Sequence, residues 1–118
     1  PPALAAALAR SIELIESESW RRERLATLSR RLSGSLSLRR WRLAASPTAI
    51  HPVIIGGNAE AVAVAAALAE DGILVPAIRP PTVPEGSARL RISLSALHEN
   101  DDVDALVAAL HRAEGRAR

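Results

Sequence analysis

The chain has 118 residues, 48% of them hydrophobic and 24% charged, and its formal net charge at pH 7 is +2. This length and composition fit one globular domain, and so small a positive charge does not indicate nucleic acid as the default partner. The absence of cysteine excludes disulfides and thiolate chemistry, and three scattered histidines without metal-ligand spacing give no reason to expect a metal site. No apolar run approaches the roughly 20 residues of a membrane-spanning helix.

The first 40 residues are predicted to form a helical arm. Apolar side chains recur at helical spacing twice in this stretch, first within residues 3–16 and then at Leu25, Leu28 and Leu32. Gly34 is predicted to end the second helix. The chain starts at Pro1 without an initiator methionine or a basic signal region, so we expect it to begin partway through a longer protein.

Residues 41–114 are predicted to form a small α+β domain. Pro52–Ile55 is a short apolar strand, and Asn58 is the candidate N-cap of an alanine-rich helix. Gly72 can close that helix in the left-handed conformation, and Ile73–Val75 is then predicted as a second strand.

A third strand and a terminal helix complete the predicted domain. Apolar and polar residues alternate over Ala88–Ser95, so one face would be core and the other would be available to a ligand or a second domain. The core face has Leu90, Ile92 and Leu94, whereas the other face has Arg89, Arg91, Ser93 and Ser95. The terminal helix has apolar residues at positions 103, 106, 107 and 110 and precedes a frayed tail at 115–118. The predicted fold class is α+β: a small antiparallel-rich sheet with helices packed on one face, preceded by the helical arm.

Residues 77–95 are the stretch that the residue pattern indicates as a binding site. Four of the eight prolines fall between positions 76 and 84, which makes this loop stiff and poor in backbone donors. Arg91 follows on the polar side of the strand, and an arginine fixed beside a rigid loop suits a planar anion such as a carboxylate. Arg79 and Thr82 lie in the loop itself. The alternative is that these side chains merely face solvent.

Four other features have a functional and a structural interpretation. Eight of the fifteen arginines fall within residues 21–42 and could bind nucleic acid, but a solvated helix face with interface pairing is favoured. Gly56-Gly57 resembles a phosphate-binding turn without the accompanying motif, so it is interpreted as a turn. The acidic residues between 99 and 104 lack calcium-ligand spacing and indicate helix capping. His98 is interpreted as a local hydrogen-bonding residue rather than a proton carrier.

Three segments together resemble a known enzyme family. They are Ser46-Pro47, His51 to Gly56, and Val75 to Ser95 with the following Ala96-Leu97-His98. These segments are similar to the C-terminal domain of the 8-amino-7-oxononanoate synthases, α-oxoamine synthases that use pyridoxal phosphate on a type I fold. The likeness covers residues 46–112 and extends more weakly through Trp20–Leu25. Synthases that make aminolevulinate, aminoketobutyrate or sphingoid bases have a similar Arg-Leu-Arg strand, whereas Ile78–Pro84 favours the biotin-pathway member.

The resemblance implies a reaction and a set of roles. The reaction is the decarboxylative condensation of L-alanine with a pimeloyl thioester to give 8-amino-7-oxononanoate. Arg91 would anchor the alanine carboxylate through a bidentate ion pair, and Arg79 and Thr82 would hold the far carboxylate of the acyl chain or product. The full-length protein would be a cytoplasmic homodimer, with residues 1–40 linking the absent large domain to the small domain at 41–114.

The same resemblance assigns the covalent chemistry to residues outside this chain. The family's cofactor-bearing lysine, a histidine stacked on the cofactor ring and an aspartate at its nitrogen all belong to the large domain, and this chain has no lysine. We therefore expect no catalytic, cofactor-binding or metal-binding residue here, no bound pyridoxal phosphate and no activity of the isolated chain. Neither nucleic acid nor a membrane is an expected partner.

Other interpretations of the sequence stay open. One is a related α-oxoamine synthase of the aminoketobutyrate ligase or aminolevulinate synthase type. Another is an independent arginine-rich module that binds anions or nucleic acid. A third is a purely structural chain that self-associates through an uncovered apolar face.

Overall fold

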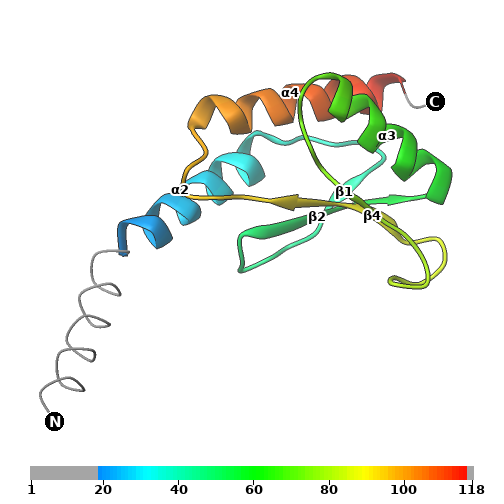
Figure 1. The fold of residues 1–118 in the computed structure, drawn as a ribbon, viewed down its shortest axis with the longest axis horizontal. Coiled ribbons are helices and arrows are strands. Elements are labelled where there is room, and N and C mark those ends of the chain that lie inside the picture. The colour runs from blue at the N-terminus through cyan, green and yellow to red at the C-terminus, as the bar shows by residue number, and fades with distance from the viewer. Residues whose placement is uncertain (1–18, 117–118) are drawn as a thin grey trace, which may run out of the picture.

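The computed structural model describes residues 19–116, so the helix predicted within residues 3–16 lies outside the described part. The elements in chain order are α2 (Ser19–Ser35), β1 (Arg42–Leu43), β2 (Ile50–Gly56), α3 (Asn58–Glu70), β3 (Ala77–Ile78), β4 (Ala88–Ser93) and α4 (Asn100–Arg116). The strands form one sheet in the order β1-β2-β4-β3, and every neighbouring pair is antiparallel. The described helices lie on one face of this sheet (Figure 1). The predicted α+β fold class is confirmed.

The central pairing of β2 with β4 sorts the side chains of the sheet onto two faces. Val53 pairs with Leu90 and His51 pairs with Ile92, and all four residues are buried. These residues face the helices, because the core is formed between the helices and this side of the sheet. Since successive side chains of a strand alternate, the residues between them face the side without helices.

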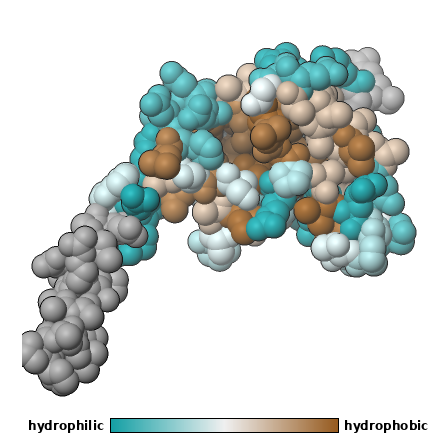
Figure 2. All heavy atoms as spheres, viewed as in Figure 1, coloured by the Kyte–Doolittle hydropathy of each residue, from teal (hydrophilic) through white to brown (hydrophobic). Residues whose placement is uncertain are grey.

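The hydrophobic core draws on every described helix. Its largest fully buried apolar side chains are Leu28 and Leu32 from α2, Leu68 from α3, Val103 and Leu110 from α4, and Val53, Leu90 and Ile92 from the sheet. Figure 2 shows hydrophobic surface gathered between α4 and the sheet, whereas hydrophilic surface covers the outer side of α4. The described part of the predicted arm therefore shares one core with the small domain, and the domain boundary at residue 40 stays a prediction.

The strand predicted at Ile73–Val75 is wrong, and the edge strand is β3 instead. Gly72 adopts a left-handed φ of 80°, as predicted. The Ile73 N–H then donates to the Leu68 carbonyl oxygen at 2.9 Å, so the backbone is still completing the end of α3. The side chain of Leu74 is 88% exposed, and pairing with β4 begins only after this closing turn.

Three predicted helix ends are also displaced. The N-cap of α3 is Gly57 in an extended conformation, and Asn58 is already the first helical residue without a side-chain cap. Gly34 does not end α2, which continues to Ser35, and the Leu36 N–H still donates to the Leu32 carbonyl oxygen at 3.0 Å. Packing of Leu32 into the core keeps this turn helical although glycine is a weak helix former. At the other end of the chain, α4 includes two residues of the predicted tail and ends at Arg116.

The burial of α2 gives a testable prediction. Replacing Leu32, which is 0% exposed, with alanine should lower the free energy of unfolding by about 2–5 kcal/mol, because it removes buried methyl groups and leaves a cavity. Urea denaturation of the 118-residue chain measures this change. The control is Leu74→Ala on an exposed leucine, which should cost far less. Equal costs for the two variants would show that α2 does not belong to the core.

A carboxylate near the end of α4 fixes the segment that leads into β1. The Glu114 carboxylate accepts hydrogen bonds from the backbone N–H groups of Arg39, Arg40 and Trp41, each at 2.9 Å to its nearer oxygen. The Ser37 N–H donates to Nε2 of His111 at 3.0 Å, one turn earlier on the same helix. The last turns of α4 therefore hold the entry to β1 in place.

This contact predicts a dependence of stability on pH. Burial raises the pKa of the Glu114 carboxyl, but the hydrogen bonds from Trp41, Arg39 and Arg40 outweigh it, so the pKa lies below its ordinary value of 4.5. The stabilisation is thus fully present above about pH 4.5 and is lost as the pH falls through the lowered pKa. Glu114→Gln should cost about 1.5–3 kcal/mol at pH 7, and the difference from wild type should shrink in acid.

Urea denaturation at pH 7 and in acid measures both effects. The matched control is Glu70→Gln, because Glu70 is an exposed glutamate at the end of α3. A Glu114→Gln variant that is as stable as the Glu70→Gln variant at pH 7 would contradict the assignment.

Candidate functional site

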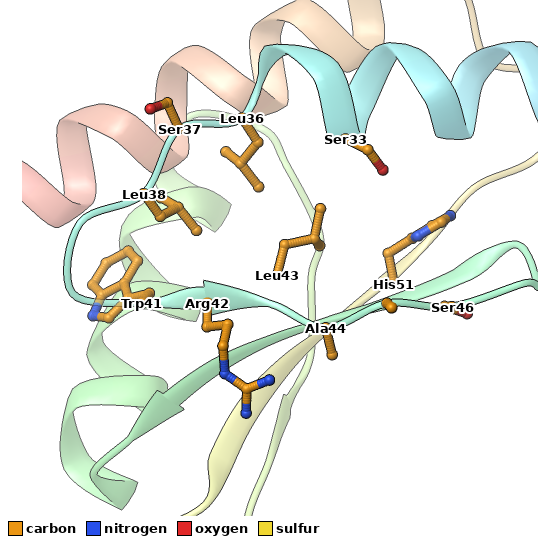
Figure 3. A pocket seen from close by; sticks show the side chains of 11 residues that line it. Ser33, Leu36, Ser37, Leu38, Trp41, Arg42, Leu43, Ala44, Ser46 and His51 are labelled. Carbon is orange, nitrogen blue, oxygen red and sulfur yellow. The ribbon is translucent and has the colours of Figure 1, made fainter.

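The face of the sheet without helices carries three arginines. Arg91 pairs with Pro52 across β2 and β4, and Arg89 pairs with Ile54. Ile54 pairs in turn with Arg42 of β1, so these side chains share one face. Figure 3 shows Arg42 pointing away from α2 and α4. The open face thus combines guanidinium groups with the apolar side chains of β2.

Arg91 is held by its backbone and leaves its guanidinium group available. Its N–H donates to the Pro76 carbonyl oxygen at 2.9 Å, and its neighbours Leu90 and Ile92 are buried. Its side chain is exposed, and no hydrogen bond or ion pair joins it to another of residues 19–116. Anchored backbone and unpaired charge are the properties required of an anion-binding arginine.

Arg79 and Thr82 lie in the loop that joins β3 to β4. The Thr82 N–H donates to the Arg79 carbonyl oxygen at 3.2 Å, which forms a turn, and both side chains are exposed. The bond between Pro80 and Pro81 within this turn is cis.

The loop and Arg91 are brought near one another without a hydrogen bond between their side chains in the described part of the chain. Pro76 lies opposite Arg91, and Arg79 lies three residues further along, which corresponds to roughly 10 Å of extended chain. No hydrogen bond joins Arg79 or Thr82 to Arg91 in the described part of the chain. A chain-like molecule with an anionic group at each end could contact both residues.

The second arginine of the strand is oriented within the sheet. The Arg89 Nε–H donates to the Ser87 carbonyl oxygen at 3.1 Å, and the Ser87 N–H donates to the Pro84 carbonyl oxygen at 3.1 Å. Gly86 adopts a φ of 76°, a left-handed conformation that glycine accepts readily. These bonds tie the end of the proline-rich loop to β4.

Several arginines on the helical side have partners within the molecule. Arg31 makes a bidentate contact with Asp104, with N–O distances of 2.8 and 2.7 Å, and this hydrogen bonding lowers the pKa of the Asp104 carboxyl. Arg40 contacts Glu60 at 3.3 Å. Arg24 donates to the His98 carbonyl oxygen at 3.4 Å. The interface pairing favoured for the arm is confirmed for these residues.

His98 and the acidic residues have the local roles predicted for them. The Ser95 N–H donates to Nδ1 of His98 at 2.9 Å, and the His98 N–H donates to the Ser95 carbonyl oxygen. The Glu99 N–H donates to a carboxylate oxygen of Asp102 at 2.7 Å, which caps the start of α4. Among the described residues, no group of three or more histidine, aspartate or glutamate side chains could hold a metal ion.

Two features of the molecule were not singled out from the sequence. One is His51, which is 2% exposed and lines a cavity of about 580 Å³ (Figure 3). The alternation of β2 could have indicated it, because position 51 shares a face with buried Val53. The other is the pair of hydrogen bonds that hold Trp41. Its backbone N–H donates to the Glu114 carboxylate, and its ring Nε1–H donates to the Glu60 carboxylate at 2.9 Å. Contacts between residues so far apart in sequence leave no local pattern.

Pyridoxal phosphate does not fit the residues present in this chain alone. The chain has no lysine, so no side-chain amine is available to bond covalently to the cofactor's aldehyde. The open face presents arginines, apolar residues and Ser93, and this set supplies no carboxylate for the ring nitrogen.

None of the helices within residues 19–116 has the length and apolar character needed to span a bilayer.

Comparison with known proteins places the chain in a family. The sequence profile of the family described as aminotransferase class I and II matches residues 1–110. The chain belongs to the aminotransferase class I and II family. An 8-amino-7-oxononanoate synthase of Aromatoleum aromaticum is 58% identical to this chain over 116 residues, which is 98% of this chain and 30% of that protein. The resemblance to 8-amino-7-oxononanoate synthases is confirmed, and the chain spans about 30% of the length of the curated relatives it matches.

Solved structures of two enzymes share the fold. A serine palmitoyltransferase of Sphingomonas wittichii aligns with a TM-score of 0.79 and 35% identity, covering 99% of this chain and 30% of that chain. An 8-amino-7-oxononanoate synthase of Francisella tularensis aligns with a TM-score of 0.68, covering 99% of this chain and 33% of that chain. Its sequence identity is 21%, so it shows likeness of fold alone. These likenesses confirm the predicted relation to part of a type I pyridoxal phosphate enzyme.

Proposed function

We propose that this chain is the C-terminal part of an 8-amino-7-oxononanoate synthase, an acyltransferase of biotin synthesis. The reaction joins L-alanine to a pimeloyl thioester, on coenzyme A or a carrier protein, and releases carbon dioxide and the free thiol carrier. The observation that supports this most directly is the 58% identity across 98% of the chain. The full-length protein would be a cytoplasmic homodimer that acts on small molecules rather than on nucleic acid or membranes.

In this proposal the chain supplies one wall of the substrate site. Arg91 binds the alanine carboxylate in a bidentate ion pair, which its exposed and unpartnered guanidinium supports. Arg79 and Thr82 bind the far carboxylate of the acyl chain. The roughly 10 Å of extended chain between Arg79 and the residue opposite Arg91 suits a molecule with an anion at each end.

The covalent chemistry belongs to the rest of the full-length protein. When bound there, pyridoxal phosphate supplies the electron sink for carbon–carbon bond formation and decarboxylation. The residues of this chain orient the alanine carboxylate and the acyl chain, so that the reacting atoms are held together. Because the chain has no lysine, we expect it to be inactive and free of cofactor by itself.

Replacing Arg91 with alanine tests the principal assignment. In the full-length enzyme, Arg91→Ala should weaken alanine binding by about 1.5–3 kcal/mol, because a charge-assisted bidentate contact is lost. Spectral titration with alanine measures the affinity, and the absorption of the lysine-bound cofactor shows that the cofactor site is intact. Arg22→Ala on the exposed side of α2 is the matched control. Alanine affinity equal to that of the control would overturn the anchoring role.

The loop residues give a separate prediction. Arg79→Ala and Thr82→Val in the full-length enzyme should raise KM for the pimeloyl thioester while leaving alanine affinity close to wild type, since the two ends of the site are separate. Steady-state kinetics with each substrate varied in turn measures this division. With a thioester of equal length that lacks the terminal carboxylate, wild type and Arg79→Ala should have the same KM for the thioester. Persistence of that difference would contradict the assignment.

A panel of amino acids decides between the oxononanoate synthase and its relatives. The proposal expects the full-length enzyme to condense L-alanine in preference to glycine and L-serine. Preference for glycine would favour the aminoketobutyrate or aminolevulinate type instead.

A further inference from the structure

Arg89 is an arginine of the open face to which the proposed function gives no role. It shares this face with Arg91, two residues further along β4, and its side chain is half-buried. Within residues 19–116 its side chain makes one hydrogen bond, from Nε to the Ser87 carbonyl oxygen, and no ion pair. The two Nη groups of Arg89 therefore keep their donors for a ligand.

The hydrogen bond to Ser87 sets the direction in which Arg89 points. Ser87 precedes Arg89 in the chain and Arg91 follows it, so this bond draws the guanidinium group away from Arg91 and towards the end of the proline-rich loop. Ser87 is itself held, because its N–H and its hydroxyl both donate to the Pro84 carbonyl oxygen. Alternate residues of a strand are roughly 7 Å apart. The two guanidinium groups of β4 are directed apart from that starting separation.

The pairing of β3 with β4 brings Arg79 to the same end of the open face as the Arg89 guanidinium. Ile78 is the cross-strand partner of Arg89 and faces the open side with it. Because the two strands are antiparallel, the chain beyond Ile78 continues in the direction of Ser87. Arg79 and Arg89 therefore both lie at the loop end of the face, whereas Arg91 lies apart from them.

No carboxylate neutralises these two arginines within the described part of the chain. Glu85 is the one acidic residue of the loop between β3 and β4, and it forms no ion pair with Arg79 or Arg89. Neighbouring like charges repel one another, and a half-buried guanidinium group has lost part of its hydration. An anion placed between the two arginines relieves both costs.

We propose that Arg89 is a second carboxylate-binding residue of the substrate site, which together with Arg79 holds the far carboxylate of a chain whose other end lies at Arg91. The ligand class is an aliphatic chain with a carboxylate at each end, and Ile78 offers apolar surface to its methylene groups. The role of Arg89 towards the acyl substrate rests on the proposed function. Two-point binding of a dicarboxylate rests on the positions of Arg89 and Arg91 alone.

Straight-chain acids test two-point binding in the 118-residue chain. Nonanedioate has as many backbone carbons as alanine joined to a pimeloyl chain, with a carboxylate at each end. It should bind at least about fivefold more tightly than nonanoate, because the second carboxylate acts at high effective concentration once the first is held. Arg89→Gln and Arg91→Gln should each reduce this ratio to about twofold, the statistical advantage of two equivalent carboxylates. NMR titration of the backbone amide signals at constant ionic strength measures the affinities.

Arg42→Gln is the matched control for this titration. Arg42 lies on the same face, but Ile54 of β2 separates it from Arg89. The control should change the affinity for both acids alike and leave their ratio as in wild type. A wild-type ratio of about twofold, or a ratio that Arg42→Gln lowers as much as Arg89→Gln, would overturn two-point binding.

The full-length enzyme tests the role of Arg89 towards the acyl chain. Glutamine places its amide nitrogen at the position of the arginine Nε, so Arg89→Gln can keep the bond to Ser87 while it removes the Nη donors. KM for the pimeloyl thioester should rise about tenfold, as expected for the loss of one charge-assisted hydrogen bond. Alanine affinity and kcat should stay close to wild type. With a heptanoyl thioester, which lacks the far carboxylate, wild type and Arg89→Gln should have the same KM.

The outcomes separate the role of Arg89 from the proposed function. An increase in KM that persists with the heptanoyl thioester, or an equal loss of alanine affinity, would show that Arg89 supports the structure and does not bind the carboxylate. An unchanged KM for the pimeloyl thioester would also overturn the role. If the full-length enzyme does not condense alanine with a pimeloyl thioester, the proposed function fails, while the nonanedioate titration still decides whether Arg89 and Arg91 act together.

Discussion

The antiparallel pairing of β2 with β4 determines which side chains of the sheet face the helices and which face its open side. It aligns Val53 with Leu90 and His51 with Ile92 on one face, where the helices cover them. The same pairing places Arg89 and Arg91 on the opposite face beside Ile54 and Pro52. A shift of one residue between these strands would exchange the two faces, burying guanidinium groups and exposing the core. Burial of the apolar face therefore fixes the position of the charged one.

Much of this arrangement could be predicted from the sequence, because it follows from local periodicity. The alternation from Ala88 to Ser93 and the apolar stripe of α4 identify their buried faces directly. The edge strand could not be placed in the same way, since Ile73–Val75 is as apolar as a strand but is still engaged in closing α3. The start of α3 was displaced by one residue because Gly57, rather than Asn58, takes the extended capping conformation.

The part of the candidate site that could be predicted is the part that lies in local sequence features. Arg91, Arg79 and Thr82 were found from a proline-rich loop and an alternating strand, and these features are local. The contacts of Glu114 and His51 join residues far apart in the chain, and a single glutamate or histidine carries no signal of its distant partner. The roles of the three site residues in substrate binding stay predictions, because they require groups from a larger protein.

The hydrogen bonds of Glu114 also constrain the order in which the molecule can be built. The backbone groups at residues 39–41 are bound by a carboxylate 73 to 75 positions later in the chain. During synthesis from the N-terminus, these three hydrogen bonds can form only after Glu114 has left the ribosome, although β1 pairs with β2 through residues made much earlier. The end of the chain is therefore needed to fix a segment near its beginning, and a chain that stops before Glu114 would lack this contact.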